Sequence, residues 1–322
     1  MIIQRGLKKI RGLVKLIDWQ FLHCTISLMI KYKSKAIDLI KQRISVRAYS
    51  EKAVSLVKET ELKKFITSLD APPFSTKIRF ILLTASPGDE ENLQKMVTYG
   101  MIKNPAGFIV GAAEKSKGLH EDFGYLMEQI ILYAVDLGLG TCWLGGTFRK
   151  GLFADALEAQ ENELIPAVAA LGVPASQSRI RDKVIAAMVK ARKRFSHERL
   201  FFKDDFDTPL NLEFMGTYRE PLEMVRLAPS ASNKQPWRII CSEKERKFHF
   251  YLHRDKSYDP ERKKSSEMAD LQKIDMGIAM CHFELTAREL NLKGKWEESK
   301  PVLSTLPKYT EYIVSWNTEV LL

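Results

Sequence analysis

The segment DMGIAMCHFELTARELNLKGKW, Asp275–Trp296, decides the fold because an earlier segment of the chain repeats its pattern. That earlier segment, DFGYLMEQIILYAVDLGLGTCW at Asp122–Trp143, aligns with it without a gap at a constant offset of 153 residues. The two copies share Asp, Gly, Met, Leu, Ala, Leu, Leu and Trp in the same order. Identity at matching positions of this kind indicates an internal duplication.

Each copy has the pattern of a core-facing helix. In the later copy, apolar residues recur at i, i+4, i+7 and i+11, which is the stripe of a helix that packs on a core: Ile274, Ile278, Cys281 and Leu285. Both copies lose helical character where glycine or asparagine occurs, and both then reach a tryptophan. We therefore predict two equivalent buried helices.

A second pair of matching segments precedes these helices. APSASNKQPWRII begins at Ala228, and APPFSTKIRFILL begins at Ala71, an offset of 157 residues. Ala, Pro, Ser and Lys coincide, and Phe80 aligns with Trp237. Each copy thus reads as helix, Ala-Pro turn, strand, insertion, long core helix and tryptophan.

The duplication predicts the domain organisation. We expect an N-terminal helical extension, residues 1–40, followed by a first half, residues 41–205, and a second half, residues 206–322. The repeat is much longer than that of a solenoid, so two similar domains are implied. The first copy lacks the Asn, Gln, Pro and Trp of the turn, and the second lacks the glycine-rich GLGTCWLGG. One shared site, with a different wall from each copy, explains these complementary losses.

Composition limits the class of protein. The 322 residues are 45% apolar and 28% charged, as in folded globular proteins. Fifty Lys and Arg against forty Asp and Glu give a net charge of +10, which favours anionic partners, with an ordinary basic surface as the alternative. The four cysteines form no CxxC pair and the six histidines form no HExxH motif, so we expect no metal site and a reducing cytoplasmic location.

The N-terminal segment is basic and apolar. Its mostly apolar core, Trp19–Ile30, contains no Lys, Arg, Asp or Glu and has 12 residues, whereas a membrane-spanning helix needs about 20. Lys15 and Asp18 interrupt any longer span, and no small-residue cleavage site follows. We predict an amphipathic helix outside the core fold and no integral membrane span, with membrane attachment as the alternative.

Three segments carry candidate binding chemistry, and the first is RISVRAYS at Arg43–Ser50. It places Arg43, Ser45 and Arg47 at alternate positions, which share one face of an extended segment. Two guanidiniums and a hydroxyl on one face suit a phosphate, because arginine forms paired charge-assisted hydrogen bonds with its oxygens. A solvated strand edge or helix start is the alternative.

The second segment is GLGTCWLGGTF, Gly138–Phe148. Glycine lets a backbone approach a flat ligand and expose its N–H groups. No P-loop or GxGxxG pattern is present, so the segment does not indicate a dinucleotide or triphosphate cradle. A helix C-cap explains Gly138 and Gly140. It does not explain Gly145 and Gly146.

The third segment is the turn APSASNKQPW, Ala228–Trp237. Pro229 and Pro236 fix backbone φ angles. Ser230, Ser232 and Asn233 offer short polar groups that can bond a ligand or cap the local backbone. The segment fits a rigid ligand wall, and a plain turn is the alternative.

Together these segments resemble the nitroreductase superfamily of FMN-dependent oxidoreductases, in particular its tandem single-chain subgroup. The resemblance covers about residues 40–300, and it rests on Arg43–Arg47 (Arg-Xaa-Ser-Xaa-Arg), Asn104–Gly111 (NPAGFIVG), Gly138–Gly146, Leu171–Pro174 (LGVP) and Ala228–Trp237. It implies an α+β, nitroreductase-like fold in which each half is a mainly antiparallel sheet flanked by helices. It also implies that the two halves form an intramolecular pseudo-dimer, so that a monomer replaces the homodimer usual in the family.

The resemblance further implies one complete FMN site. Its expected residues are Arg43, Ser45 and Arg47 for the phosphate and ribityl chain, Arg192 and Arg194 for the phosphate, Leu144, Gly145 and Gly146 for backbone contacts near flavin N5, and Pro229, Ser230, Ala231 and Asn233 along the flavin from the second half. A second site is not expected, because Thr76 occupies the asparagine position of the first turn and the second half has no Arg-Ser-Arg equivalent.

The implied activity is that of an FMN-dependent NAD(P)H oxidoreductase with ping-pong hydride transfer to a nitroaromatic, a quinone or a similar small-molecule electron acceptor. The chemistry would take place on flavin N5, so no catalytic side chain is expected. One alternative is a flavin-binding or sensory module without turnover. Another is a basic nucleic-acid-binding protein, suggested by the net charge and by KVIAAMVKARKR at Lys183–Arg194.

Overall fold

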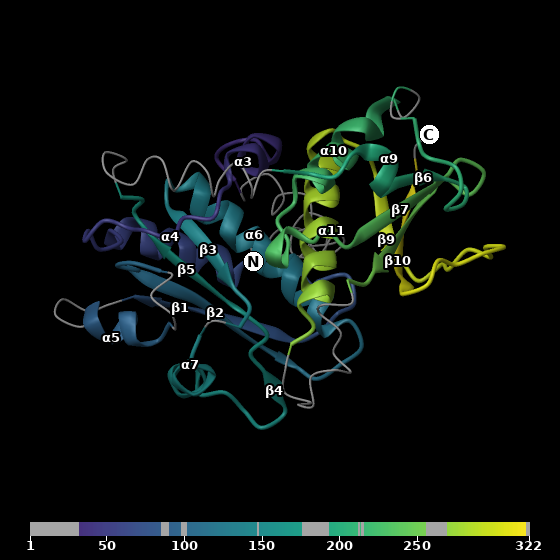
Figure 1. Ribbon diagram of the computed structural model, residues 1–322. Coiled ribbons are helices and arrows are strands. Elements are labelled where there is room, and N and C mark those ends of the chain that lie inside the picture. The colour runs from purple at the N-terminus through teal and green to yellow at the C-terminus, as the bar shows by residue number, and fades with distance from the viewer. Residues whose placement is uncertain are drawn as a thin grey trace, which may run out of the picture. The chain divides into compact units, whose positions relative to one another are not determined.

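The computed structural model describes residues 32–84, 90–97, 102–146, 148–175, 193–211, 213, 216–255 and 269–319, and Figure 1 shows its elements. Residues 1–31, which include most of the predicted N-terminal helical extension, lie outside the described residues. From Ser34 onward the chain forms one compact unit. Within the described ranges, none of the helices combines the length and the apolar character that crossing a membrane requires.

The first half builds a five-stranded sheet. Its strands are β1 (Ile78–Thr84), β2 (Gly107–Glu114), β3 (Gly140–Leu144), β4 (Glu163–Leu164) and β5 (Val168–Gly172). Their order is β1-β2-β5-β3, β4 pairs with β2, and every pairing is antiparallel. Strand β2 covers the second half of the NPAGFIVG motif, lies in the interior of the sheet, and is buried except at its last residue, Glu114.

The second half builds another five-stranded sheet. Its strands are β6 (Phe201–Lys203), β7 (Trp237–Ser242), β8 (Lys247–His253), β9 (Gly294–Glu297) and β10 (Thr310–Thr318). The helices that accompany it are α9 (His197–Leu200), η3 (Gly216–Tyr218), α10 (Arg219–Leu227), η4 (Ala231–Asn233) and α11 (Leu271–Glu289). The strand order is β6-β7-β8-β10-β9. Only β6 with β7 is parallel, so the predicted α+β class with mainly antiparallel sheets is confirmed.

The helices of the first half are α3 (Ala36–Gln42), α4 (Leu56–Thr67), α5 (Glu90–Lys95), α6 (Leu119–Asp136) and α7 (Lys150–Leu157). The long helix α6 matches the predicted core helix. Gly138, at φ +70°, follows its end in the left-handed conformation expected of a C-cap. Helix α3 packs on α6, α10 and α11, so residues 34–40, which the sequence placed in the extension, belong to the compact unit.

The two sheets repeat one topology. Without β6, the order β7-β8-β10-β9 of the second sheet reproduces the order β1-β2-β5-β3 of the first. In both, the Ala-Pro turn leads into the first of these strands, and the strand after the long helix carries the repeated tryptophan, Trp143 or Trp296. The short strand β6 joins the second sheet although it precedes position 206. The chain therefore enters the second sheet before the boundary that the sequence suggested.

Helices α6 and α11 pack backbone to backbone in the middle of the compact unit (Figure 1). A Cβ atom on Gly124 would collide with the carbonyl oxygen of Ile274, and a Cβ atom on Gly277 would collide with that of Glu121. Both pairs, 124 with 277 and 121 with 274, are equivalent under the offset of 153. The contact is thus reciprocal, as at an interface with two-fold symmetry.

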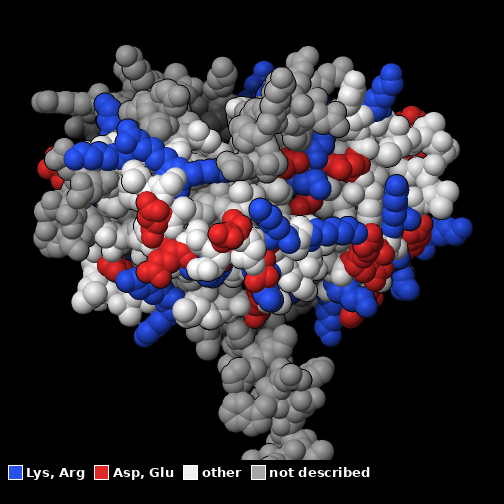
Figure 2. All heavy atoms as spheres, turned by 90° about the horizontal axis from the view of Figure 1, so that it is seen from below, with Lys and Arg blue, Asp and Glu red and all other residues white. Residues whose placement is uncertain are grey.

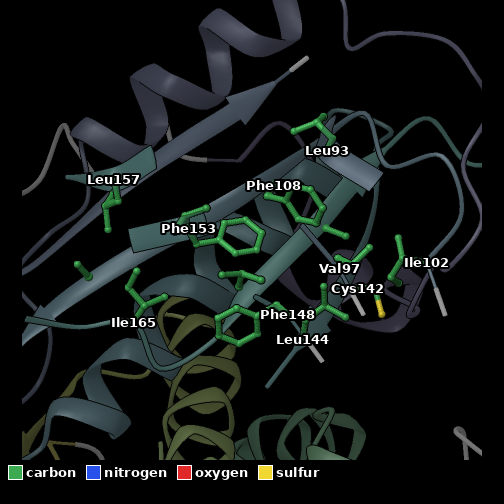
Figure 3. Packing of buried hydrophobic residues seen from close by; sticks show 14 of the residues in the cluster. Leu93, Val97, Ile102, Phe108, Cys142, Leu144, Phe148, Phe153, Leu157 and Ile165 are labelled. Atoms are coloured by element: carbon green, nitrogen blue, oxygen red, sulfur yellow. The ribbon is translucent and has the colours of Figure 1, made fainter. Parts of the chain in front are cut away.

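The other face of the first sheet carries an apolar cluster under α7 (Figure 3). Phe108 of β2 packs edge-on against Phe153 with ring centroids 5.1 Å apart, and Phe148 packs on the same ring at 5.7 Å. The strand registers place His249 of β8 at the position equivalent to Phe108. There a fully buried imidazole contacts Ser315 Oγ through Nδ1 at 2.7 Å. The corresponding faces of the two sheets are therefore apolar in one half and partly polar in the other.

Candidate functional site

The second-half turn is held in a fixed conformation by its own residues and by α11. Asp275 Oδ1 accepts a hydrogen bond from the Ala231 backbone N–H at 2.9 Å. Ser230 Oγ accepts one from the Gln235 N–H at 2.9 Å. Ser232 and Asn233 have φ angles of 49° and 57°, in the left-handed region. The turn thus has a defined, hydrogen-bonded conformation, which fits both the ligand wall and the plain turn that the sequence suggested.

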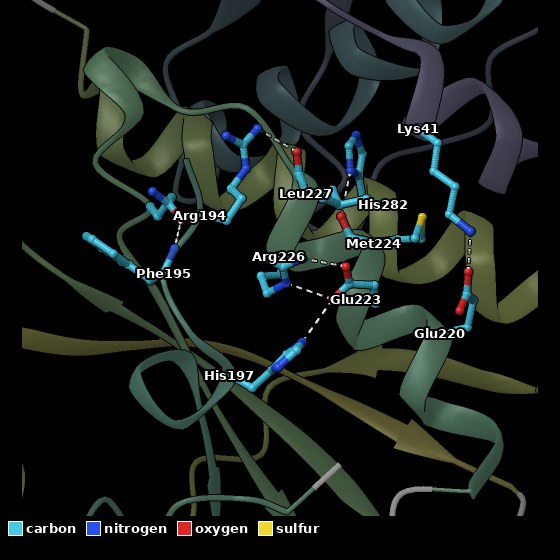
Figure 4. A network of polar contacts seen from close by, with 11 residues as sticks. Lys41, Arg194, Phe195, His197, Glu220, Glu223, Met224, Arg226, Leu227 and His282 are labelled. Carbon is cyan, nitrogen blue, oxygen red and sulfur yellow. Dashed lines mark hydrogen bonds and ion pairs between the residues drawn. The ribbon is translucent and has the colours of Figure 1, made fainter. Parts of the chain in front are cut away.

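Arg194 lies directly on this turn (Figure 4). Its Nη1 donates to Asn233 Oδ1 at 3.2 Å, and its Nη2 donates to the Leu227 carbonyl oxygen at 2.8 Å. Asn233 Nδ2 in turn donates to the Lys193 carbonyl oxygen at 2.8 Å, and the Phe195 N–H donates to Gln235 Oε1 at 2.8 Å. Two residues predicted for the site from distant parts of the sequence are therefore in contact.

The segment that carries Arg43, Ser45 and Arg47 runs along the edge of β3. The Val46 N–H donates to the Thr141 carbonyl oxygen at 2.8 Å, and Ser45 forms a bridge with the same residue. The Arg43 side chain is only 6% exposed, and its Nε lies 3.4 Å from Glu128 Oε1. Among the described residues, Arg43 Nη1 has no hydrogen-bond partner. A buried N–H donor in this state favours a bound acceptor.

The arginine charges come together at this edge. Burial, together with the nearby charges of Arg43 and Arg226, lowers the pKa of Arg194 to about 10. Burial raises the pKa of the Cys142 thiol on β3, while the charges of Arg47 and Arg43 oppose that rise. Arg43 thus lies close enough to both Arg194 and Cys142 for its charge to influence each of them. The positive charges repel one another, and an anion would relieve that repulsion.

The glycine-rich segment meets the second half at the start of α11. Strand β3 ends at the buried Leu144. A Cβ atom on Gly145 would lie 2.7 Å from Leu271 Cδ2, at the first residue of α11, whereas a Cβ atom on Gly146 would meet nothing within 4 Å. Asp275, which binds the turn, lies one helical turn further along α11. The predicted wall from the first half and the predicted wall from the second half thus converge on one helix end.

The equivalent place around the first-half turn is built differently. Asp122 accepts hydrogen bonds from the N–H groups of Phe74 and Thr76, both at 2.9 Å. The Phe74 ring packs over Gly118, which is equivalent to Leu271. Glu298 stands at the position of Gly145, where it forms an ion pair with Lys117 at 2.9 Å. Among the described residues, this place has neither the glycines nor the arginines of the other.

Two buried glutamates were not predicted from the sequence. Trp143 Nε1 donates to Glu128 Oε2 at 2.8 Å, and Trp296 Nε1 donates to Glu284 Oε2 at 2.6 Å. Each repeated tryptophan therefore binds a carboxylate of the long helix in its own half. The repeated tryptophan could have indicated these glutamates, because a buried indole N–H needs a hydrogen-bond acceptor. The aspartates that hold the turns, Asp122 and Asp275, were likewise identical in the repeat.

The remaining predictions about the site concern Arg192, the turn residues, the cysteines and a metal. Arg192 lies outside the described residues. Pro229 and Ser230 lead into η4, so all four predicted turn residues lie together. Cys142, Cys241 and Cys281 are buried free thiols. Within the described part of the chain, no group of three or more His, Cys, Asp or Glu side chains could hold a metal ion.

Comparison with known proteins identifies relatives of most of the compact unit. A family profile described as "Putative TM nitroreductase" matches residues 35–287. No curated protein matches the chain. A solved structure described as a "putative nitroreductase" from Thermotoga maritima is 20% identical, covers 88% of this chain and 94% of its own, and has a TM-score of 0.55, which shows a common fold.

Shorter solved proteins match about half of the chain. A nitroreductase family protein from Clostridium novyi NT is 22% identical over 44% of this chain and 87% of its own, with a TM-score of 0.37. A "putative nitroreductase in complex with FMN" from Desulfovibrio desulfuricans is 22% identical over 48% of this chain and 95% of its own, with a TM-score of 0.36.

Proposed function

Because the chain belongs to the nitroreductase family, we propose that it is an FMN-dependent NAD(P)H oxidoreductase with one flavin site built from both halves. One observation carries the proposal. Arg43, Arg194 and the turn at Asn233 come together beside the glycine segment. These are the residue types that a phosphorylated flat cofactor requires.

The arginines fit the phosphate of FMN. Arg43 Nη1 is a buried donor without a protein partner among the described residues, and Arg194 is a half-buried cation whose pKa the charge of Arg43 lowers. A phosphate would accept hydrogen bonds from such groups and offset their mutual repulsion. The proposal assigns the phosphate to Arg43, Arg47 and Arg194, with the Ser45 hydroxyl beside them. Arg192 is included on the family resemblance.

The glycines and the turn fit a flat ring system. Gly146 has open space where a side chain would stand, and Leu144 and Gly145 precede it at the end of β3. The turn supplies Pro229, Ser230, Ala231 and Asn233, which enter the proposal as one rigid wall. Bound FMN would supply the hydride-transfer chemistry. The chain's own part is to hold the ring between the two walls and to present amide N–H groups and positive charge to it.

The proposal includes the pseudo-dimer. Its support is the repeated strand order and the reciprocal contact in which Gly124 meets Ile274 and Gly277 meets Glu121. A monomer with this arrangement can build from one chain the composite site that a two-fold dimer builds from two. We propose a cytoplasmic monomer that takes electrons from NAD(P)H and delivers them to a small acceptor such as a nitroaromatic or a quinone.

The surface gives less support to a nucleic-acid-binding function. On the face shown in Figure 2, Lys and Arg alternate with Asp and Glu. In the described part of the chain, several basic side chains form ion pairs, such as Lys203 with Glu243 at 3.1 Å and Lys41 with Glu220 at 2.8 Å. A nucleic-acid surface concentrates one sign of charge. This face does not.

The test of the proposed function is spectroscopic. We expect the purified protein, after incubation with FMN and removal of unbound cofactor, to be yellow and to bleach when NAD(P)H is added without oxygen. Retained flavin that no nicotinamide donor bleaches would favour the module without turnover. A colourless protein that cannot be loaded with FMN would contradict the proposal.

A further inference from the structure

A buried cluster of polar groups joins the two halves next to the arginine site. Glu128, in the middle of α6, is fully buried. Its Oε2 accepts the hydrogen bond from Trp143 Nε1, and its Oε1 lies 3.4 Å from Arg43 Nε. The same Oε1 lies 3.1 Å from Nε2 of His282, a fully buried residue of α11 in the second half. A histidine of one half thus shares a carboxylate with an arginine of the other.

The hydrogen-bond partners decide where the protons of His282 lie. Its Nδ1 is 3.0 Å from the Met224 carbonyl oxygen, a contact visible in Figure 4. A carbonyl oxygen can only accept, so Nδ1 carries a hydrogen. Burial alone would raise the pKa of Glu128, but the hydrogen bond from His282 and the charge of Arg43 outweigh it and lower the pKa. Trp143 Nε1 donates to Glu128 and Arg43 Nε faces it, which is the environment of an acceptor-only carboxylate, and Nε2 of His282 then also carries a hydrogen.

We infer that His282 is held as an imidazolium, and that its charge allows Glu128 to orient Arg43 without cancelling the positive charge of the anion site. Arg43 and Glu128 alone would be neutral together. With His282 protonated, the three side chains carry one net positive charge. This inference rests on the proposed function only for the identity of the anion, which is the FMN phosphate. His282 is a positioning residue, because it acts through Glu128 and Arg43.

Among the described residues, the neighbours of the cluster supply no other balancing charge. On α11, burial raises the pKa of the Cys281 thiol well above its usual value, so that this neighbour is neutral. The next carboxylate, Glu284, forms an ion pair with Arg288 and accepts a hydrogen bond from Tyr125. On the side of the second-half turn, Arg194 adds a further positive charge near Arg43. Because the cluster is buried, water and salt screen its charges only weakly. A change of one charge within it therefore strongly affects a nearby anion.

Charge-changing variants test the inference through ligand affinity. In His282→Gln the charges of Arg43 and Glu128 cancel each other, and we expect FMN affinity to fall about tenfold or more. Glu128→Gln lets His282 become neutral while Arg43 keeps its charge, and we expect affinity within about threefold of the wild type. The double variant also keeps one positive charge, so it should recover most of the affinity lost in His282→Gln. Riboflavin, which lacks the phosphate, should bind all four proteins alike.

A second measurement observes the proton itself. Histidine NMR of the ligand-free wild type at pH 7 should show His282 with both ring nitrogens protonated. His249 is the internal reference, because burial lowers its pKa to about 4 and keeps it neutral. Thermal unfolding verifies that each variant is folded.

The two measurements separate the possible failures. A neutral His282 in the ligand-free protein would overturn the inference. So would a double variant that binds FMN as weakly as His282→Gln, since a structural defect is not repaired by a second substitution. If the wild type binds neither FMN nor riboflavin, the proposed function fails, and the NMR result still decides the protonation of His282.

Discussion

The two Ala-Pro turns share a scaffold and differ in what they present. In both, the aspartate at the start of the long helix accepts a hydrogen bond from the same backbone position, Phe74 for Asp122 and Ala231 for Asp275. The following serine has a positive φ angle in both turns, 61° in the first and 49° in the second. The two turns therefore share a backbone conformation.

The difference lies in how the remaining polar groups are used. In the first half, Asp122 also binds the N–H of Thr76, so its carboxylate is fully engaged by the turn. In the second half, the corresponding residue, Asn233, contacts Arg194 and the Lys193 carbonyl oxygen instead. Among the described residues, Asp275 Oδ2 has no partner. In the first turn both oxygens of the aspartate thus bind the turn backbone, whereas in the second turn one aspartate oxygen does so and Asn233 contacts Arg194.

The largest expected effect concerns the contact that both halves share. Gly277→Ala would force a methyl group into the Glu121 carbonyl oxygen, which is backbone and cannot yield easily. We expect a loss of about 3–5 kcal/mol in the free energy of unfolding, or no folded protein. Urea denaturation measures it. Gly151→Ala, in α7 with nothing near its added Cβ, is the matched control and should be neutral or slightly stabilising.

Low pH should destabilise the second sheet at His249, whereas the equivalent position of the first sheet, Phe108, does not titrate. Burial lowers the pKa of His249 to about 4, so the folded protein takes up fewer protons there than the unfolded chain. Above about pH 6.5 the histidine does not change the free energy of unfolding. As the pH falls toward 4, it lowers the free energy of unfolding by about 3 kcal/mol in all.

His249→Phe copies the residue of the first sheet, Phe108, and tests this pH dependence. The drop in unfolding free energy between pH 7 and pH 4 should shrink, although His120, whose pKa is also lowered to about 4, keeps its own share. An unchanged pH dependence in the variant would contradict the role given to His249.

The two aspartates should respond differently to the same substitution. Asp122→Asn replaces an acceptor of two backbone N–H groups with a side chain that has one acceptor oxygen, and we expect a loss of about 2 kcal/mol. Burial raises the pKa of Asp275 well above its usual value, and only one of its oxygens accepts from the turn. Asp275→Asn should therefore cost less than about 0.5 kcal/mol at pH 7. Equal losses in urea denaturation would remove the distinction between the turns.

The smallest expected effect is on binding. Asn233→Ala removes the side chain that joins the turn to Arg194, and we expect FMN affinity to fall about tenfold by fluorescence titration. Thr76→Ala, the substitution at the equivalent position of the first turn, should leave FMN affinity unchanged. Equal affinities for the two variants would show that the second turn is not the wall of the site.

Features that depend on periodic patterns were predictable from the sequence. The repeat predicted α6 and α11 as equivalent helices, and the Ala-Pro turns predicted the starts of β1 and β7. The short strand β6 was not predicted, because its three residues pair through backbone groups that no side-chain pattern reveals.

Within the site, the residue types came from the sequence and the contacts did not. The contact between Arg194 and Asn233 joins two predicted residues, but nothing in their spacing indicated it. Glu128 and His282 meet across the two halves although they are not equivalent in the repeat. A polar contact between distant segments has no period, so only the folded chain shows it.

The most direct test of the composite site is the number of flavins per chain. Saturated protein freed of excess FMN would be assayed for flavin by absorbance and for protein by amino-acid analysis, with the molecular mass in solution measured in parallel. We expect one FMN per chain in a monomer. Two per chain would contradict the claim that a single pair of walls forms a site, and none would contradict the site itself.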